Sequence, residues 1–140
     1  MRVKDYLLRY KDARREIARV QAEIEEVKAQ AERITPRYGL EPRGSGVDHD
    51  KIGSVLARAE VYEDELRARE ADAMTLCVET IGFIDRIPSA DSRLILTLRY
   101  INLKSWREIG REMYLSDRSV YYLHGRALRE AQVVLDETLQ

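Results

Sequence analysis

Apolar residues recur at alternating spacings of three and four through the first third of the chain. The positions are Val3, Tyr6, Tyr10, Ala13, Ile17, Val20, Ile24, Val27, Ala31 and Ile34. An apolar stripe with this spacing predicts a long helix of the kind found in coiled coils. Thr35 precedes Pro36, and the residue before a proline is disfavoured in the helical region. We therefore expect the helix to end there.

A second periodic segment follows a stretch that is rich in proline and glycine. The stretch "TPRYGLEPRGSGV" predicts a loop within residues 35–50. Asp48 or Asp50 can then cap a second helix, which Pro88 ends. Its apolar face consists of Ile52, Val55, Ala59, Tyr62, Leu66, Ala73, Leu76, Cys77, Ile81, Ile84 and Ile87, with one break in register at Arg69.

Residues 1–88 are thus predicted to form one domain, a coiled-coil hairpin of two antiparallel helices with a loop at 35–50. A parallel pair of first helices would oppose Arg9 with Arg14 and gain only one attractive pair, so flanking charges do not favour it. The hairpin can pair with a second copy to bury the remaining apolar surface. We expect a homodimer or a higher homo-oligomer.

After Pro88 the pattern changes to short helices with sharp breaks. The segment "SADSRLILTLRYI" opens on Ser89 or Asp91 as a cap, and its core face is Leu94, Ile95, Leu98 and Ile101. Ser105 caps "SWREIGREM", with Glu108 in the capping-box position, and Ser116 caps the segment from Asp117 to Leu139. A short helix, a turn and a second helix predict a helix-turn-helix domain over residues 89–140.

The second helix of this pair has two different faces. Its inward face collects Val120, Leu123, His124, Ala127, Leu128 and Ala131, and Trp106, Ile109 and Leu115 are expected to join them in the core. The outward face collects arginine, tyrosine and glycine, and arginine pairs with guanine edges or with phosphate. The candidate DNA-binding residues are Lys104, Arg107, Ser116, Arg118, Ser119, Tyr121, Tyr122, Arg126 and Arg129. The alternative is a solvated arginine face on a small helical core.

Charge and composition narrow the classes of function. The net charge is −1, yet residues 91–130 carry eight Lys/Arg against five Asp/Glu, which indicates a local basic patch. Cys77 is the only cysteine, His49 and His124 lack metal-ligand spacing, and no nucleotide-binding or hydrolase motif is present. We expect no catalysis, no cofactor and no metal. Without a long apolar run we also expect no membrane association and a cytoplasmic location.

The segment "SWREIGREMYLSDRSVYYLHGRAL" resembles the helix-turn-helix of region 4 in bacterial sigma factors, although Tyr114 stands where those proteins usually have glycine. The order of elements along nearly the whole chain is similar to small phage regulators of late transcription of the ArpU/RinA-like type. The resemblance implies an all-α, DNA-binding regulator from a phage or prophage that activates late genes. It implies DNA contacts by Arg118, Ser119, Tyr122 and Arg126.

Two other functions are compatible with the same residues. A helix-turn-helix joined to oligomerising helices is also expected of a small terminase-like DNA-packaging subunit. A sigma-like segment is equally expected of an adaptor that contacts RNA polymerase instead of DNA.

Overall fold

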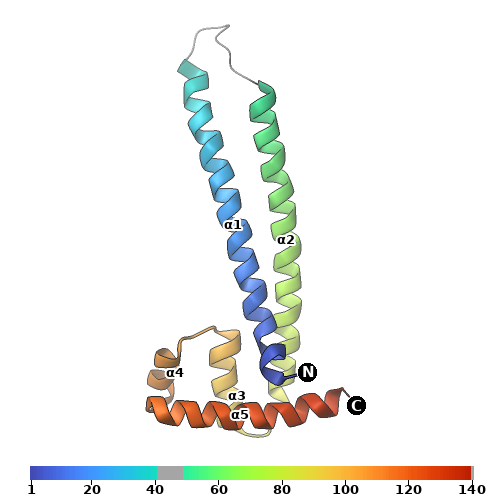
Figure 1. Ribbon diagram of the computed structural model, residues 1–140, viewed down its shortest axis with the longest axis vertical. Coiled ribbons are helices and arrows are strands. Elements are labelled where there is room, and N and C mark those ends of the chain that lie inside the picture. Colours follow the sequence, from blue (N-terminus) through green and yellow to red (C-terminus); the bar gives the residue numbers. More distant parts are fainter. Residues whose placement is uncertain (41–48, 140) are drawn as a thin grey trace. The chain divides into compact units, whose positions relative to one another are not determined.

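The computed structural model describes residues 1–40 and 49–139, and the side chains of residues 1–33 and 50–139 (Figure 1). Every secondary-structure element in this part of the chain is a helix, which confirms the all-α prediction. The elements are α1 (Val3–Leu40), α2 (His49–Asp85), α3 (Ala90–Leu96), the π-helix η1 (Thr97–Ile101), α4 (Trp106–Met113) and α5 (Asp117–Thr138).

The predicted boundaries of the first two helices need correction. Helix α1 does not end at Thr35 but continues to Leu40, because a proline weakens a helix and removes one hydrogen bond without forbidding its continuation. Asp50 lies inside the first turn of α2, so it is not the cap. The alternative cap, Asp48, and the central part of the predicted loop lie outside the described residues.

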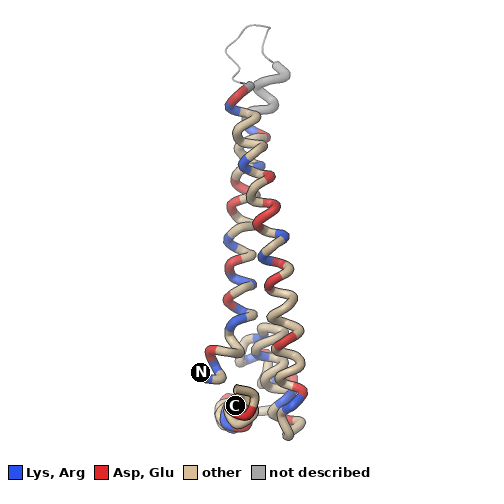
Figure 2. The backbone as a smooth tube through the Cα atoms, turned by 90° about the vertical axis from the view of Figure 1, so that its right-hand side faces the viewer, with Lys and Arg blue, Asp and Glu red and all other residues tan. Residues whose placement is uncertain are grey.

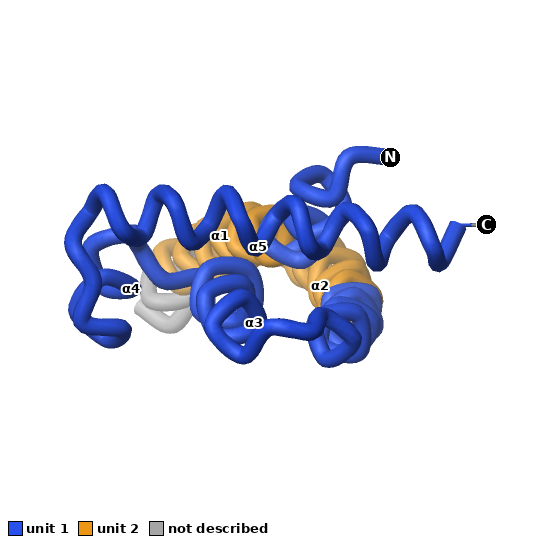
Figure 3. Tube along the Cα trace, turned by 90° about the horizontal axis from the view of Figure 1, so that it is seen from below, with its two compact units in different colours: residues 1–13, 72–140 blue, residues 14–71 orange. Residues whose placement is uncertain are grey.

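The chain divides into two compact units, Arg14–Ala71 (unit 2) and Met1–Ala13 with Asp72–Gln140 (unit 1), which Figure 3 distinguishes by colour. This division differs from the predicted boundary after residue 88. The beginning of α1 and the end of α2 belong to unit 1, which also holds α3, α4 and α5. The reason is their burial, because Leu7 of α1 and Phe83 of α2 lie in the same core cluster as Ile95 of α3.

Unit 2 consists of one stretch of α1 beside one stretch of α2. The two stretches run antiparallel, as the ion pairs Lys28–Glu63 (3.1 Å) and Glu16–Arg69 (3.5 Å) show. The buried residues are Ile17, Val20 and Ile24 from α1 and Ala59 from α2. Charged residues of both signs follow each other along both helices (Figure 2). Arg69, where the apolar register breaks, is half-buried and pairs with both Glu16 and Glu65.

Unit 1 has a core built by residues from every element of that unit. Its buried members are Val3, Leu7, Phe83, Ile84, Ile87, Ile95, Leu96, Leu98, Tyr100, Ile109, Val120, Ala127, Ala131, Val134 and Leu135. Leu94, predicted to be core, is 46% exposed, because α3 buries a different face against α5. Ser89 precedes α3 as predicted, but its hydroxyl donates to Glu130 of α5 (2.7 Å) and makes no capping bond.

Candidate nucleic-acid interface

The turn between α4 and α5 is short and closely packed. Ser105 caps α4, because its hydroxyl accepts a hydrogen bond from the Glu108 N–H (3.2 Å). Tyr114 ends the helix in the left-handed conformation with φ 56°, at the position where the sigma-like pattern has glycine. The Leu115 N–H then returns to the Gly110 carbonyl at 2.9 Å. A Cβ atom on Gly110 would lie 3.0 Å from the Leu115 carbonyl oxygen, so a small residue is needed here.

Helix α5 begins at a second serine cap. The Ser116 hydroxyl accepts from the Ser119 N–H at 3.2 Å and donates to the Ser119 hydroxyl at 3.0 Å. Three buried residues then fix the rotation of α5 on the core: Val120, Ala127 and Ala131. Because one face of α5 is held in this way, the opposite face is presented to solvent over its first three turns.

The predicted DNA-binding residues of α5 lie on this free surface. The exposed ones are Ser116, Arg118, Ser119, Tyr121, Tyr122, Arg126 and Arg129. Tyr121 is 75% exposed and Tyr122 is 58% exposed, which is unusual for aromatic side chains that serve only packing. All seven predicted residues that lie in α5 or cap it are therefore on the surface of unit 1.

An aromatic and basic group lies at the centre of this face. The Arg118 guanidinium lies 5.5 Å from the centre of the Tyr122 ring, and its Nη2 is 3.5 Å from the tyrosine hydroxyl. The Tyr121 and Tyr122 rings meet edge to face, with 5.7 Å between their centres. These contacts place a guanidinium and two aromatic rings side by side on the surface.

The two candidates that precede α5 differ from each other. Arg107 is exposed in the first turn of α4. Lys104 is half-buried and forms an ion pair with Glu112. Its charge is therefore partly compensated within the unit, and Arg107 is better placed for contact with a phosphate.

Trp106 was predicted to be core, and this is wrong. The side chain is 38% exposed, because Trp106 is the first residue of α4 and its neighbours cover only part of it. The Arg99 guanidinium lies 4.2 Å from the ring centre, and the His124 ring approaches at 4.6 Å edge to face. No signal in the sequence indicates this arrangement, because the two partners of Trp106 come from η1 and α5.

His124 links this exposed tryptophan to the core. Its Nε2 lies 2.8 Å from the hydroxyl of Tyr100, a residue that is 1% exposed. Burial, followed by the nearby charges of Lys4 and Arg99, lowers the pKa of His124 to about 4. Burial also raises the pKa of Tyr100 to about 12. Both groups are therefore neutral at pH 7.

Two further observations concern other classes of site. Among the described residues, no three His, Cys, Asp or Glu side chains come together in a way that would hold a metal ion. In the same part of the chain, no helix has the length and apolar character needed to cross a membrane.

No protein-family model, no curated protein and no solved structure matches the chain.

Proposed function

We propose that this protein is a sequence-specific, double-stranded DNA-binding regulator of a phage or prophage, and that it activates late genes. The observation that carries the proposal is the free face of α5. It presents Arg118, Tyr122, Arg126 and Arg129 while the opposite face is locked on the core. A helix of this kind enters the major groove, where arginine reads guanine edges.

Each part of the helix-turn-helix has its own role in this proposal. Arg118, Ser119 and Tyr122 in the first turns of α5 contact base edges. Arg126 and Arg129 follow on the same side one and two turns later and hold the phosphates or neighbouring bases. Arg107 on α4 contacts the backbone. The coiled coil of α1 and α2 joins two copies, so that two such helices meet half-sites about one helical turn apart, roughly 34–36 Å.

A binding selection from random duplexes, followed by affinity measurements, tests this function. Arg118→Ala with Arg126→Ala is expected to weaken the selected site about 100-fold, since one base-reading arginine contributes roughly 1–3 kcal/mol. Arg14→Ala with Arg15→Ala removes the same charge from exposed positions of unit 2 and serves as the matched control. Affinity should also fall with salt, at a log–log slope of about −0.9 per phosphate contact. Absence of duplex binding at low salt would contradict the proposal.

A small terminase-like packaging subunit is the second candidate, and one observation favours it. Met74, Val78 and Ile81 of α2 are 70%, 64% and 42% exposed, and their spacing puts them on one side of the helix. Such an apolar strip suits self-association beyond a dimer. Light scattering separates the two functions, because a closed ring of many copies favours packaging, whereas a dimer with one sharp site upstream of late genes favours activation.

An adaptor that contacts RNA polymerase is the third reading. It predicts binding to polymerase that survives Arg118→Ala with Arg126→Ala, together with no affinity for any duplex. The selection and the double variant therefore also decide this case.

A further inference from the structure

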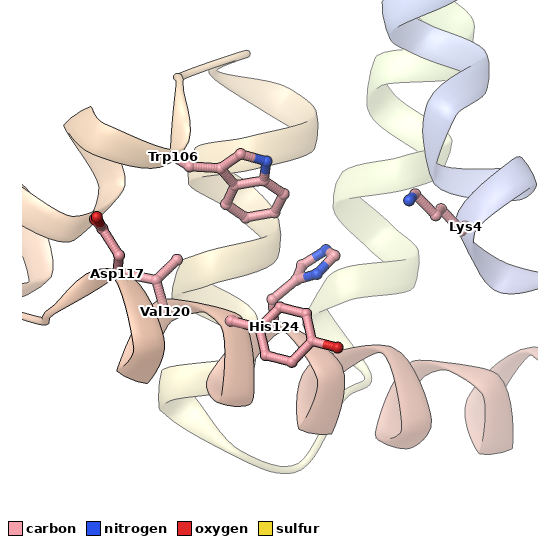
Figure 4. Close-up of a pocket in the computed structure, with 6 residues that line it drawn as sticks. Lys4, Trp106, Asp117, Val120 and His124 are labelled. Carbon is pink, nitrogen blue, oxygen red and sulfur yellow. The ribbon is translucent and has the colours of Figure 1, made fainter.

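A cavity of about 400 Å³ opens beside α5, on the flank that carries Tyr121. It lies entirely within unit 1, and its lining comes from the beginning of α1, from α4 and from α5 (Figure 4). The lining residues are Lys4, Trp106, Asp117, Val120, Tyr121 and His124. Lys4 and Trp106 were not among the residues predicted to bind DNA.

Three hydrogen-bond donors face this space without a partner of their own. They belong to lining residues: the Lys4 ammonium, the Trp106 indole N–H and the Tyr121 hydroxyl. Among the described residues none of the three makes a hydrogen bond or an ion pair. In Figure 4 the nitrogen-bearing side of the Trp106 ring faces the side from which Lys4 enters. An ammonium with two neutral donors around one cavity is a donor set that suits an anion.

The single carboxylate of the lining does not cancel this positive character. Asp117 lies at the end of the cavity away from Lys4, beyond Trp106 and Val120 (Figure 4). His124 between them is neutral at pH 7, because burial and then the charge of Lys4 lower its pKa to about 4. His124 therefore adds no charge to the lining, and Lys4 is the one cation among the described lining residues.

The position of Lys4 is fixed by contacts of the neighbouring backbone. The Val3 N–H donates to the Gln132 side-chain oxygen at 2.9 Å, and the Gln132 side-chain nitrogen donates to the Met1 carbonyl at 3.2 Å. Val3 itself is buried in the core of the unit. These bonds hold the first residues on α5, one turn beyond Leu128, so the backbone that carries the Lys4 side chain has a defined place beside α5.

We propose that this cavity binds a phosphate of the DNA backbone, with Lys4 as the charged ligand and Trp106 and Tyr121 as neutral donors. The inference rests on the proposed function. A helix in the major groove has a phosphate backbone on each side. On one flank of α5 stand Ser119 and Arg126, which line a second, smaller cavity with Asp91. The Lys4 cavity provides the contact on the opposite flank.

The continuity of the surface favours DNA over a free anion. Tyr121 lines the cavity and also touches Tyr122, whose ring packs with Arg118 on the proposed base-reading face. A backbone phosphate bound beside Tyr121 would therefore belong to the same duplex that α5 enters. A free phosphate gains nothing from this neighbourhood, so inorganic phosphate is the alternative that the test must distinguish.

The test compares duplex affinity and its salt dependence for the full chain and five variants, one of which is Arg118→Ala. Lys4→Ala is expected to weaken binding about fivefold on specific and unrelated duplexes alike, and to lower the salt slope by about 1. Trp106→Phe and Tyr121→Phe each remove one donor but keep a ring, so each should weaken binding two- to threefold, roughly. Lys51→Ala removes the same charge from an exposed position in unit 2 and should leave affinity and slope unchanged.

Three outcomes have separate meanings. If the unchanged protein binds no duplex, the proposed function fails, and this inference fails with it. If the unchanged protein binds, and Arg118→Ala weakens it while Lys4→Ala matches Lys51→Ala, only the phosphate contact is wrong. If inorganic phosphate alone produces the full change in Trp106 fluorescence that the duplex produces, the cavity is a site for free phosphate, and the proposal is also wrong.

Discussion

The two compact units of this chain bury apolar residues in different ways. In unit 2 the core is one line of contact between two helices, and ion pairs such as Lys28–Glu63 lie beside it. In unit 1 a single core cluster collects residues from α1, α2, α3, η1, α4 and α5. A side chain in unit 2 is therefore enclosed by one partner helix, whereas a side chain in unit 1 is enclosed from several directions.

This difference implies that the two units have different roles. A two-helix layer is repetitive and tolerates change at any single position, because its neighbours can move closer when a side chain is truncated. A core enclosed on all sides holds surface residues in fixed positions, as a binding face requires. The proposed DNA face belongs to the second kind of unit, and the following predictions test whether the contrast is real.

The largest expected effect is truncation of a core isoleucine in each unit. Ile95→Ala should lower the free energy of unfolding of unit 1 by about 4 kcal/mol, and Ile24→Ala that of unit 2 by about 2 kcal/mol, because the remaining cavity collapses more easily between two helices. Trp106 is the only tryptophan, so its fluorescence reports unit 1 during urea unfolding, while circular dichroism reports both units. Equal losses in the two variants would show that the contrast in packing has no energetic consequence.

The same contrast decides how far the fold was predictable. In unit 2 the three-and-four repeat identified Ile17, Val20 and Ile24, and all three are buried. In unit 1 the repeat holds only in part: Val3, Ile84 and Ile87 lie on it and are buried. Leu7 and Phe83 lie outside it but are buried, and Ile81 lies on it but is 42% exposed. A helix that meets one partner keeps one stripe, whereas a helix end that meets several elements buries residues that no single period describes.

The candidate site shows a similar limit. The exposure of Arg118, Tyr122 and Arg126 followed from the rotation of one amphipathic helix, which local periodicity supplies. The position of Lys4 did not follow, because it depends on how the beginning of the chain reaches Gln132 of α5. The exposure of Trp106 did not follow either, because its contacts with Arg99 and His124 come from other elements. A contact across 129 positions leaves no periodic signal in the sequence.

The second prediction concerns pH and applies to unit 1. The pKa of His124 is lowered from 6.5 to about 4, so above pH 6.5 the imidazole is neutral in both states and unit 1 has its full stability. Between pH 6.5 and 4 the unfolded chain binds the proton first, so stability falls as the pH falls, by about 2 kcal/mol after allowance for the solvent that reaches the half-buried ring.

Denaturation curves of the unchanged protein and of His124→Gln across this range measure the effect. Glutamine keeps an acceptor for the Tyr100 hydroxyl but does not titrate. The difference in unfolding free energy between the two proteins should shrink as the pH falls from 6.5 to 4. A constant difference would mean that the histidine is not held neutral by its surroundings.

The third prediction concerns the turn that orients α5. Tyr114 has φ 56° and is 94% exposed, so replacement by glycine removes backbone strain and loses almost no packing. Tyr114→Gly should therefore raise the free energy of unfolding of unit 1 by about 1 kcal/mol. Leu103 has φ 57° but is half-buried, and Leu103→Gly serves as the comparison, in which lost packing offsets the gain. Destabilisation by Tyr114→Gly would show that the tyrosine side chain has a structural role in the turn.

The smallest expected effect lies in unit 2. Lys28 and Glu63 approach to 3.1 Å, but their side chains are 59% and 38% exposed, so solvent screens the pair. Lys28→Ala is expected to lower the free energy of unfolding of unit 2 by less than about 0.5 kcal/mol, and high salt should abolish the difference. The double variant with Glu63→Gln isolates the interaction from other effects of each substitution. A coupling free energy above about 1 kcal/mol would exceed the range of exposed ion pairs. Ion pairs rather than the apolar stripe would then hold the two helices together, and the contrast between the units would be one of charge.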